Sequence, residues 1–348
     1  MRKYLIIASV ILLAVACHEK KTDPYAPLPR VAASAEMQQA FEGYLKAVAD
    51  SSVEMHSIMV LQHGNVIEEK QFAPDTAHIM NSVSKTFTST AVGFAIREGL
   101  LSLDDRIVDI FPDSVPEEAS DTLGRVTVRH LLTMNCGHGT DPTYTIREGE
   151  GDWIRAFMQW PFKFEPGTCF CYNSLGTYLL SAAVQKVTGQ KVVDYLDTRL
   201  WQPLGIPKPF WQDSPAGINT GGWGLYLRTE DMARMGLCIL GGGQFGGKQV
   251  IPAEWVAEMG KKQVSSCPAG LNEDALREYG IDPSVSDWLQ GYGYQMWRCR
   301  HGAFRADGAN GQYIIILPEK DAVIVATAHV QDMQKELNLI WDHILPAL

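Results

Sequence analysis

A serine and a lysine stand three residues apart in the segment Asn81-Ser82-Val83-Ser84-Lys85-Thr86-Phe87-Thr88. If this segment opens a helix, Ser82 and Lys85 share one helical face. The positive end of the helix dipole would favour an alkoxide on Ser82, and its backbone N–H would be free to serve as an oxyanion donor. Burial would lower the pKa of Lys85 and leave a neutral amine that can accept the serine proton. The alternative is a purely structural role, in which the serine caps a helix and the lysine is solvated.

Helical apolar spacing continues along 86–98 and returns at 178–187, and 37–49 is typical of an amphipathic helix. Strand patterns lie near the two ends of the chain, at 58–61 and 66–68 around a His63-Gly64-Asn65 turn, and at 292–297, 313–317 and 322–326. The last two strands are continuously apolar, so helices must cover both faces of their sheet. One such helix is predicted from a stripe at Met333, Leu337, Ile340 and Ile344.

This order of elements predicts an α+β fold with three layers, α/β/α. An antiparallel sheet built from the two ends of the chain would be flanked by helices, and a mainly helical lobe would be inserted at roughly 86–285. A cleft between sheet and lobe is where we expect a binding site.

Two further blocks carry a family resemblance. They are Gly99-Leu100-Leu101-Ser102-Leu103-Asp104-Asp105-Arg106-Ile107-Val108-Asp109-Ile110-Phe111-Pro112 and Val126-Thr127-Val128-Arg129-His130-Leu131-Leu132-Thr133. Together with the Ser-x-x-Lys segment, they resemble the serine β-lactamase-related hydrolases, the class C-like branch that also holds DD-peptidases and esterases. The resemblance covers nearly all of the chain past about residue 35. It implies a β-lactamase/transpeptidase-like fold and acyl-enzyme chemistry on Ser82.

The second motif of that family is a Pro-Gly turn followed by Tyr-x-Asn. Its counterpart here is Glu165-Pro166-Gly167-Thr168-Cys169-Phe170-Cys171-Tyr172-Asn173-Ser174. The resemblance implies that Tyr172 lies between Ser82 and Lys85 and relays a proton, with a pKa that could fall beside an ammonium group. Ser174 holds the usual asparagine position and Asn173 precedes it, so both are candidates for substrate binding. Glu165 is interpreted as a turn residue.

The third motif is expected before the terminal hairpin, within 301–312. Ungapped counting puts Ala303 where the family carries a cation, and Arg305 or His301 could replace that charge. Backbone N–H groups near Ala306 or Gly308 are candidates for the second oxyanion donor. Asp307 is a substrate-binding candidate, with a turn role equally open.

The N-terminus indicates export. Arg2 and Lys3 precede an apolar run, Tyr4–Ala16, which is too short to span a membrane, and Cys17 follows it. The pattern resembles a bacterial lipoprotein signal, with plain signal-peptidase cleavage as the alternative. We therefore expect a signal peptide at 1–16, lipidation of Cys17, a tether at 17–34, a hydrolase domain at 35–348, and a location in the cell envelope facing the periplasm. The six remaining cysteines are predicted to be mostly buried free thiols.

Composition and motifs limit the classes of binding partner and cofactor that we expect. The formal net charge is −10 and no basic run occurs, which argues against nucleic-acid binding. No metal-binding or dinucleotide motif is present, so no metal or organic cofactor is expected. The sequence thus predicts a serine hydrolase acting on a β-lactam, a D-Ala-D-Ala or other peptidoglycan peptide, or a small ester or amide. The alternative is a non-catalytic binder or sensor of wall peptides.

Overall fold

A six-stranded antiparallel sheet forms the centre of the computed structural model, which describes residues 25–149, 151–268 and 271–348. The strand order is β2-β1-β10-β9-β8-β7, so a strand from the start of the chain lies beside one from its end. The predicted α+β fold is confirmed. The strands are β1 (Glu54–Gln62), β2 (Asn65–Gln71), β7 (Trp297–Arg298), β8 (Phe304–Gly308), β9 (Gln312–Leu317) and β10 (Ala322–His329).

Two hairpins form where the sequence supplies residues that accept a left-handed backbone. His63 and Gly64 have φ angles of 50° and 77° in the turn between β1 and β2. Asp321, at φ 47°, ends the turn between β9 and β10. Such angles strain most side chains but suit turn residues. Both predicted hairpins are confirmed.

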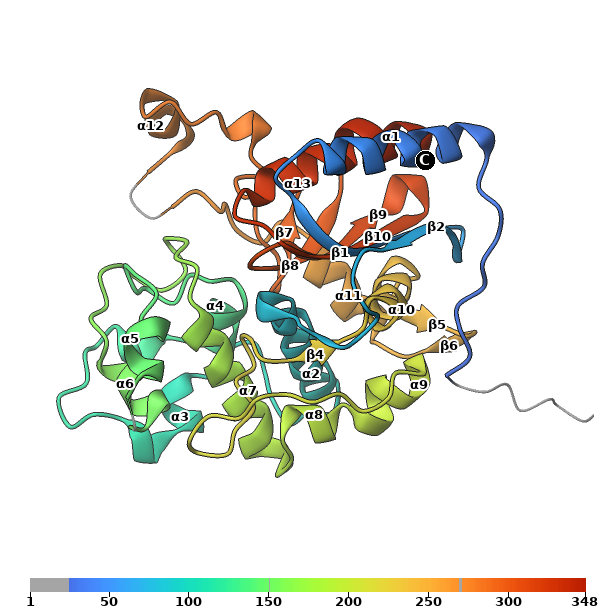
Figure 1. Cartoon of the computed structure of the whole chain (residues 1–348). Helices are drawn as coiled ribbons and strands as arrows, with labels where there is room; N and C mark the ends of the chain where they lie inside the picture. The colour runs from blue at the N-terminus through green and yellow to red at the C-terminus, as the bar shows by residue number, and fades with distance from the viewer. Residues whose placement is uncertain (1–24, 150, 269–270) are drawn as a thin grey trace, which may run out of the picture.

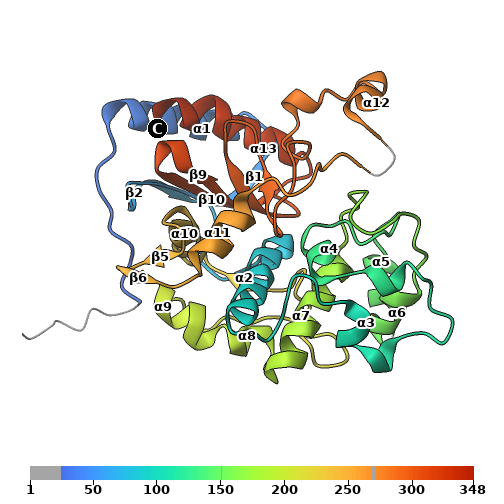
Figure 2. The ribbon, with the colours of Figure 1, turned by 180° about the vertical axis from the view of Figure 1, so that it is seen from behind.

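Helices cover both faces of the sheet, as the continuously apolar strands require (Figure 1, Figure 2). Along β10, Val323 and Val325 belong to one core, whereas Ile324 belongs to the other. Helices α1 (Ala35–Ala49) and α13 (Met333–Leu339) pack on the second core, and α10 (Thr229–Leu240) and α11 (Ala253–Gly260) on the first. Each fully buried Val, Leu or Ile contributes about 1.5–3 kcal/mol, so both layers stabilise the central strands.

The predicted C-terminal stripe is confirmed. Leu337, Ile340 and Ile344 are buried in the second core, and Met333 packs against it. The stripe begins in α13 and continues through a π-helical turn, Ile340–Ile344.

A mainly helical lobe stands beside the sheet (Figure 1). Its two long helices, α2 (Ser84–Arg97) and α7 (Ser174–Thr188), are in direct contact. The predicted bounds, roughly 86–285, span this lobe and also α10 and α11. The shorter helices of the chain are α3 (Ile107–Ile110), α4 (Val128–Leu132), α5 (Thr143–Arg147), α6 (Trp153–Gln159), α8 (Val192–Tyr195), α9 (Gln202–Leu204) and α12 (Glu273–Glu278). Short strands also pair outside the main sheet, β3 (His78–Ile79) with β4 (Tyr226–Leu227) and β5 (Gln244–Phe245) with β6 (Lys248–Gln249).

The strand predicted at 292–297 is largely absent, and only Trp297 at its end belongs to β7. The backbone turns at Gln295, where φ is 65°, which no strand allows. The buried Gln295 side chain accepts a hydrogen bond from Thr177 at 2.6 Å and donates one to the Leu131 carbonyl at 3.0 Å. The segment therefore joins the sheet to the lobe instead of extending the sheet.

The predicted signal peptide and Cys17 lie outside the described residues. The described part of the predicted tether follows the domain surface, where Arg30 forms ion pairs with Glu69 and Glu230. No helix within the described ranges is long and apolar enough to cross a membrane. All six cysteines there are free thiols; Cys136, Cys238 and Cys299 are buried, and the other three are partly exposed.

Candidate active site

Ser82 lies in a single 3-10 turn, Asn81–Val83, that leads into α2. Asn81 has a φ of 45°, so the chain bends sharply just before the serine. Val83 donates the first backbone hydrogen bond of the turn, to the Met80 carbonyl at 3.0 Å. The N–H of Ser82 precedes that bond and has no intrahelical acceptor, which leaves it able to serve as an oxyanion donor.

Lys85 is buried, with 1% of its surface exposed, in the first turn of α2. Its Nζ lies 2.8 Å from Ser82 Oγ, 3.0 Å from Ser174 Oγ and 2.8 Å from the Gly222 carbonyl oxygen. Burial lowers the pKa of Lys85 to about 7, although the negative charges of Asp141 and Asp307 oppose this shift. A large fraction of Lys85 is therefore a neutral amine at neutral pH, which is the form that can act as a base.

Tyr172 packs over the amine, with Lys85 Nζ 4.9 Å from the centre of its ring. The ring stacks on Trp297, with centroids 5.4 Å apart and planes 20° apart. Burial raises the pKa of Tyr172, and a hydrogen bond with Ser82 opposes that rise only in part. The expected fall in the pKa of Tyr172 is therefore wrong: burial outweighs the effects that would lower this pKa, and Tyr172 remains a protonated phenol.

Ser174 begins α7 and brings the second motif to the lysine. Its backbone N–H donates to Asp141 Oδ2 at 3.1 Å. A carboxylate at the start of a helix is stabilised by the helix dipole, so Asp141 fixes the position of Ser174. Asp141 was not among the sequence candidates because it stands in a loop without periodic pattern.

Asn173 does not reach the reacting groups. Its Oδ1 caps α7 by accepting from the Gly176 N–H at 3.0 Å, and its Nδ2 lies 3.0 Å from His138 Nδ1. The side chain is 1% exposed. The side chain is committed to the helix cap and does not line the cavity in front of Ser82.

The cavity in front of Ser82 has a volume of about 220 Å³. Its lining residues come from β3, from the 3-10 turn that carries Ser82, from α5, from the start of α7 and from the loops around 212, 223 and 309. They are Ile79, Asn81, Ser82, Thr143, Tyr144, Arg147, Ser174, Gln212, Gly222, Trp223 and Ala309.

Comparison with known proteins agrees with this geometry. The sequence model of the Beta-lactamase family matches residues 38–348. The 6-aminohexanoate-dimer hydrolase of Paenarthrobacter ureafaciens is 27% identical over 298 residues, which cover 77% of this chain and 71% of the relative. Penicillin-binding protein 4 of Amycolatopsis lactamdurans is 27% identical over 310 residues, 76% of each chain. The octameric penicillin-binding protein homologue from Pyrococcus abyssi superposes with a TM-score of 0.68 at 20% identity, covering 89% of this chain and 77% of the homologue, and shares the fold.

The chain belongs to the Beta-lactamase family. Members of this family are serine hydrolases that include β-lactamases, carboxypeptidases, esterases and amidases. The family resemblance therefore holds for the whole domain past residue 37.

The third family motif falls on β8, but its predicted cation is missing from the cavity. Arg305 is buried, and its Nε donates to Asp307 Oδ2 at 2.8 Å. His301 lies against Trp341, with ring centroids 5.4 Å apart, beside the C-terminal helices. Neither residue supplies the charge, and Ala303 at the family position is an apolar side chain.

Strand alternation explains this outcome. Ala306 belongs to the core on the lobe side, so Arg305 and Asp307 must point to the opposite face. The Asp307 carboxylate is held by Arg305 there and does not line the cavity, and it does not stand in a turn either. Gly308 lies against the backbone before Ser82, where a Cβ atom would come within 2.4 Å of the Met80 carbonyl oxygen. Which N–H near Ala306 or Gly308 completes the oxyanion site stays a prediction.

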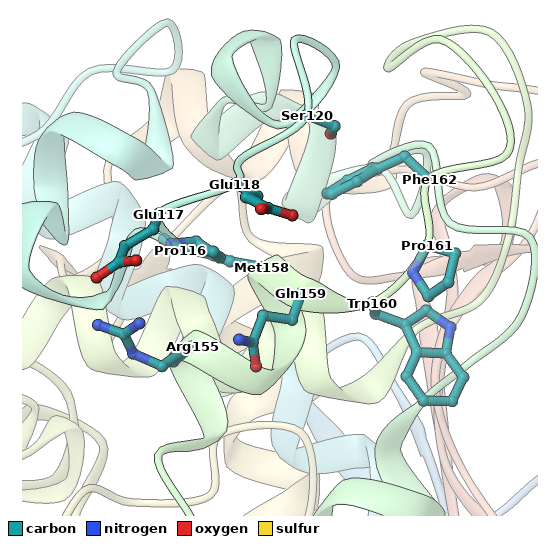
Figure 3. A pocket seen from close by; sticks show the side chains of 10 residues that line it. All are labelled: Pro116, Glu117, Glu118, Ser120, Arg155, Met158, Gln159, Trp160, Pro161 and Phe162. Carbon is teal, nitrogen blue, oxygen red and sulfur yellow. The ribbon is translucent and has the colours of Figure 1, made fainter.

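A second cavity, of about 570 Å³, lies in the lobe and shares no lining residue with the Ser82 cavity (Figure 3). Its side chains come from the 116–120 loop, from α6 and from the residues that follow α6. It holds no serine–lysine pair. Glu165, on a nearby turn, is exposed and paired with Arg125 at 2.6 Å, in agreement with a turn role.

Proposed function

We propose that this chain is a serine hydrolase that forms an acyl-enzyme on Ser82. The observation that carries the proposal is the contact of Ser82 Oγ with a buried lysine whose pKa is lowered to about 7. A neutral amine next to a hydroxyl, at the start of a helix, is the arrangement that activates a serine.

The reaction would proceed by two acyl transfers. The Ser82 O–H passes its proton to Lys85 Nζ while Oγ bonds to the substrate carbonyl carbon, and the carbonyl electrons move onto oxygen. The oxyanion is held by the Ser82 N–H and a second donor. When the C–O or C–N bond breaks, Tyr172 or Lys85 returns a proton to the leaving group. Water then attacks the ester carbon and gives a proton to Lys85. Lys85 returns a proton to Ser82 Oγ as the bond between this oxygen and the acyl carbon breaks, which releases the acid and restores the serine hydroxyl.

Tyr172 serves here as a neutral phenol, because burial raises its pKa. It would pass its phenolic proton to the departing atom and be reprotonated by Lys85, so that it starts and ends as a neutral phenol. Lys85 is thus the base, and Tyr172 completes the proton path between base and leaving group.

The substrate is an ester or amide with a small acyl group, which suits a cavity of about 220 Å³. Family membership leaves three classes open, namely β-lactams, D-Ala-D-Ala peptides and small esters or linear amides. The relative named as a 6-aminohexanoate-dimer hydrolase adds weight to linear amides.

Intact mass spectrometry after exposure to a fluorophosphonate and to penicillin tests this proposal. The wild type should gain one adduct from at least the fluorophosphonate, and Ser82→Ala should gain none. Ser102→Ala, which alters an exposed serine outside the cavity, should react like the wild type. Hydrolysis of nitrocefin, a nitrophenyl ester and a D-Ala-D-Ala peptide then ranks the substrates. A wild type that forms no adduct and hydrolyses none of them would favour the wall-peptide binder.

The proposal includes export and lipid anchoring. The positive start, the short apolar run and Cys17 support it. In a bacterial host grown with labelled palmitate, the wild type should be labelled and sediment with membranes, whereas Cys17→Ser should lose the label. Unlabelled wild type released into the periplasm would instead indicate plain cleavage.

A further inference from the structure

The Ser82 cavity has a single charged residue in its lining. Of the eleven lining residues in the described part of the chain, Arg147 is the only Lys, Arg, Asp or Glu. It is the last residue of α5, on the lobe side of the cavity. The nearby Lys85 lies behind the serine, buried, and is not in this lining. A substrate in the cavity therefore meets one cation and no carboxylate.

Arg147 has no ionic partner within the described ranges. Its guanidinium carbon lies 4.3 Å from the ring centre of Tyr144, and it forms no salt bridge or side-chain hydrogen bond with any described residue. By contrast, Arg106 and Arg125 are both held by carboxylates. The ring fixes the plane of the Arg147 guanidinium and leaves its N–H groups for a ligand.

Apolar side chains border the same cavity. Tyr144 is 65% exposed and Ile79 is 36% exposed, although both are large and hydrophobic. Trp223 adds a partly exposed indole to the lining. Exposed apolar groups around a cavity mark a surface that binds a ligand with an apolar body.

We infer that Arg147 binds the carboxylate of an anionic substrate whose apolar body packs on Tyr144 and Trp223. This inference rests on the proposed serine hydrolase function and adds a substrate class to it: esters or amides that carry a carboxylate. The position just before β8 where the family carries its cation holds Ala303, and Arg305 is paired on the other face of the sheet. Arg147 is thus the cation in the cavity lining that can meet a substrate carboxylate, and it comes from α5.

Paired substrates test the inference. One pair places the carboxylate on the leaving group, with 4-acetoxybenzoate and its methyl ester. The other places it on the acyl group, with 4-nitrophenyl hydrogen terephthalate and its methyl ester. Arg147→Gln should lower kcat/KM about tenfold for the charged member of at least one pair, mainly through KM. The neutral members should change less than twofold, and added salt should reduce the wild-type preference.

Arg97→Gln is the matched control. Arg97 is also an exposed arginine three residues after an aromatic ring, 5.3 Å from the ring of Phe94, and it lies outside the cavity. The Arg97→Gln variant removes the same charge from the protein and should leave kcat/KM unchanged for both substrate pairs. Arg147→Lys should restore part of the preference, because the charge returns without the planar fork.

Binding of 4-phenylbutyrate and 4-phenylbutyramide by calorimetry separates this inference from the catalytic proposal. The wild type should prefer the carboxylate and Arg147→Gln should lose that preference, even if Ser82 proves inert. One outcome overturns the inference and leaves the proposed hydrolase standing. In that outcome the wild type hydrolyses the neutral esters, but neither the substrate pairs nor the two ligands show a preference for the carboxylate that depends on Arg147. Equal losses on charged and neutral substrates would also overturn it.

Discussion

Lys85 Nζ lies 2.8 Å from Ser82 Oγ and equally 2.8 Å from the Gly222 carbonyl oxygen. A neutral amine has two hydrogens and one lone pair. The Gly222 carbonyl can only accept, and the Ser174 hydroxyl, at 3.0 Å, can take the second N–H. The lone pair is then left for the Ser82 O–H. The partners of Lys85 therefore aim its basic electron pair as well as burying it.

Substitution of Gly222 should disturb this arrangement. A Cβ atom there would lie 2.7 Å from the Ser174 carbonyl oxygen and 3.5 Å from Lys85 Nζ, so backbone must move. Gly222→Ala should reduce kcat/KM at least tenfold and lower the free energy of unfolding by about 1–3 kcal/mol. Gly124→Ala, where a Cβ meets nothing within 4 Å, is the control and should be neutral in both measurements. Full activity in Gly222→Ala would contradict the assigned role of this carbonyl.

Removal of the Asp141 charge should move the pH profile. The Asp141 carboxylate favours the ammonium form and so raises the pKa of Lys85 against the effect of burial. Asp141→Asn should therefore shift the acid limb of kcat/KM to lower pH. Asp342→Asn, an exposed carboxylate in the C-terminal helical segment, should leave the limb in place. A shift to higher pH in Asp141→Asn would show that the limb belongs to another group.

The variant Tyr172→Phe distinguishes the role of Lys85 as the base from the role of Tyr172 as the proton relay. Loss of the phenol should lower kcat/KM about 100-fold or more, since positioned proton transfer contributes at that scale. The acid limb should remain near pH 7, because Lys85 sets it. Far-ultraviolet circular dichroism and thermal unfolding check that the variant folds. Loss of the limb in Tyr172→Phe would instead assign the titrating base to Tyr172.

Much of the fold was predictable because its signals are periodic. The stripe around Leu337 predicted the C-terminal helix, and the apolar run around Ile324 predicted a strand covered on both faces. Ser82, Lys85 and Tyr172 were found because a motif with fixed spacing carries them. In these cases local pattern and tertiary packing agree.

The errors have particular physical causes. The alternation at 292–297 suggested a strand, but Gln295 adopts a left-handed backbone to join sheet and lobe, which pattern alone does not reveal. Strand alternation alone could have excluded Arg305 as the cation of the cavity, because Ala306 faces the lobe and its neighbours on the strand must face the other way. Asp141 and Arg147 lie in a loop and a five-residue helix, where no periodicity marks them, and only the folded chain brings them to Ser82.

The rate of acylation as a function of pH tests the central claim most directly. Lys85 must be neutral to act, and burial lowers its pKa to about 7, so activity is lost as pH falls through that value. The rate of fluorophosphonate labelling of Ser82, followed by intact mass from pH 5 to 9.5, should rise with pH and level off above about 7. A rate that is flat across this range, or that keeps rising toward the ordinary lysine pKa of about 10.4, would contradict the account.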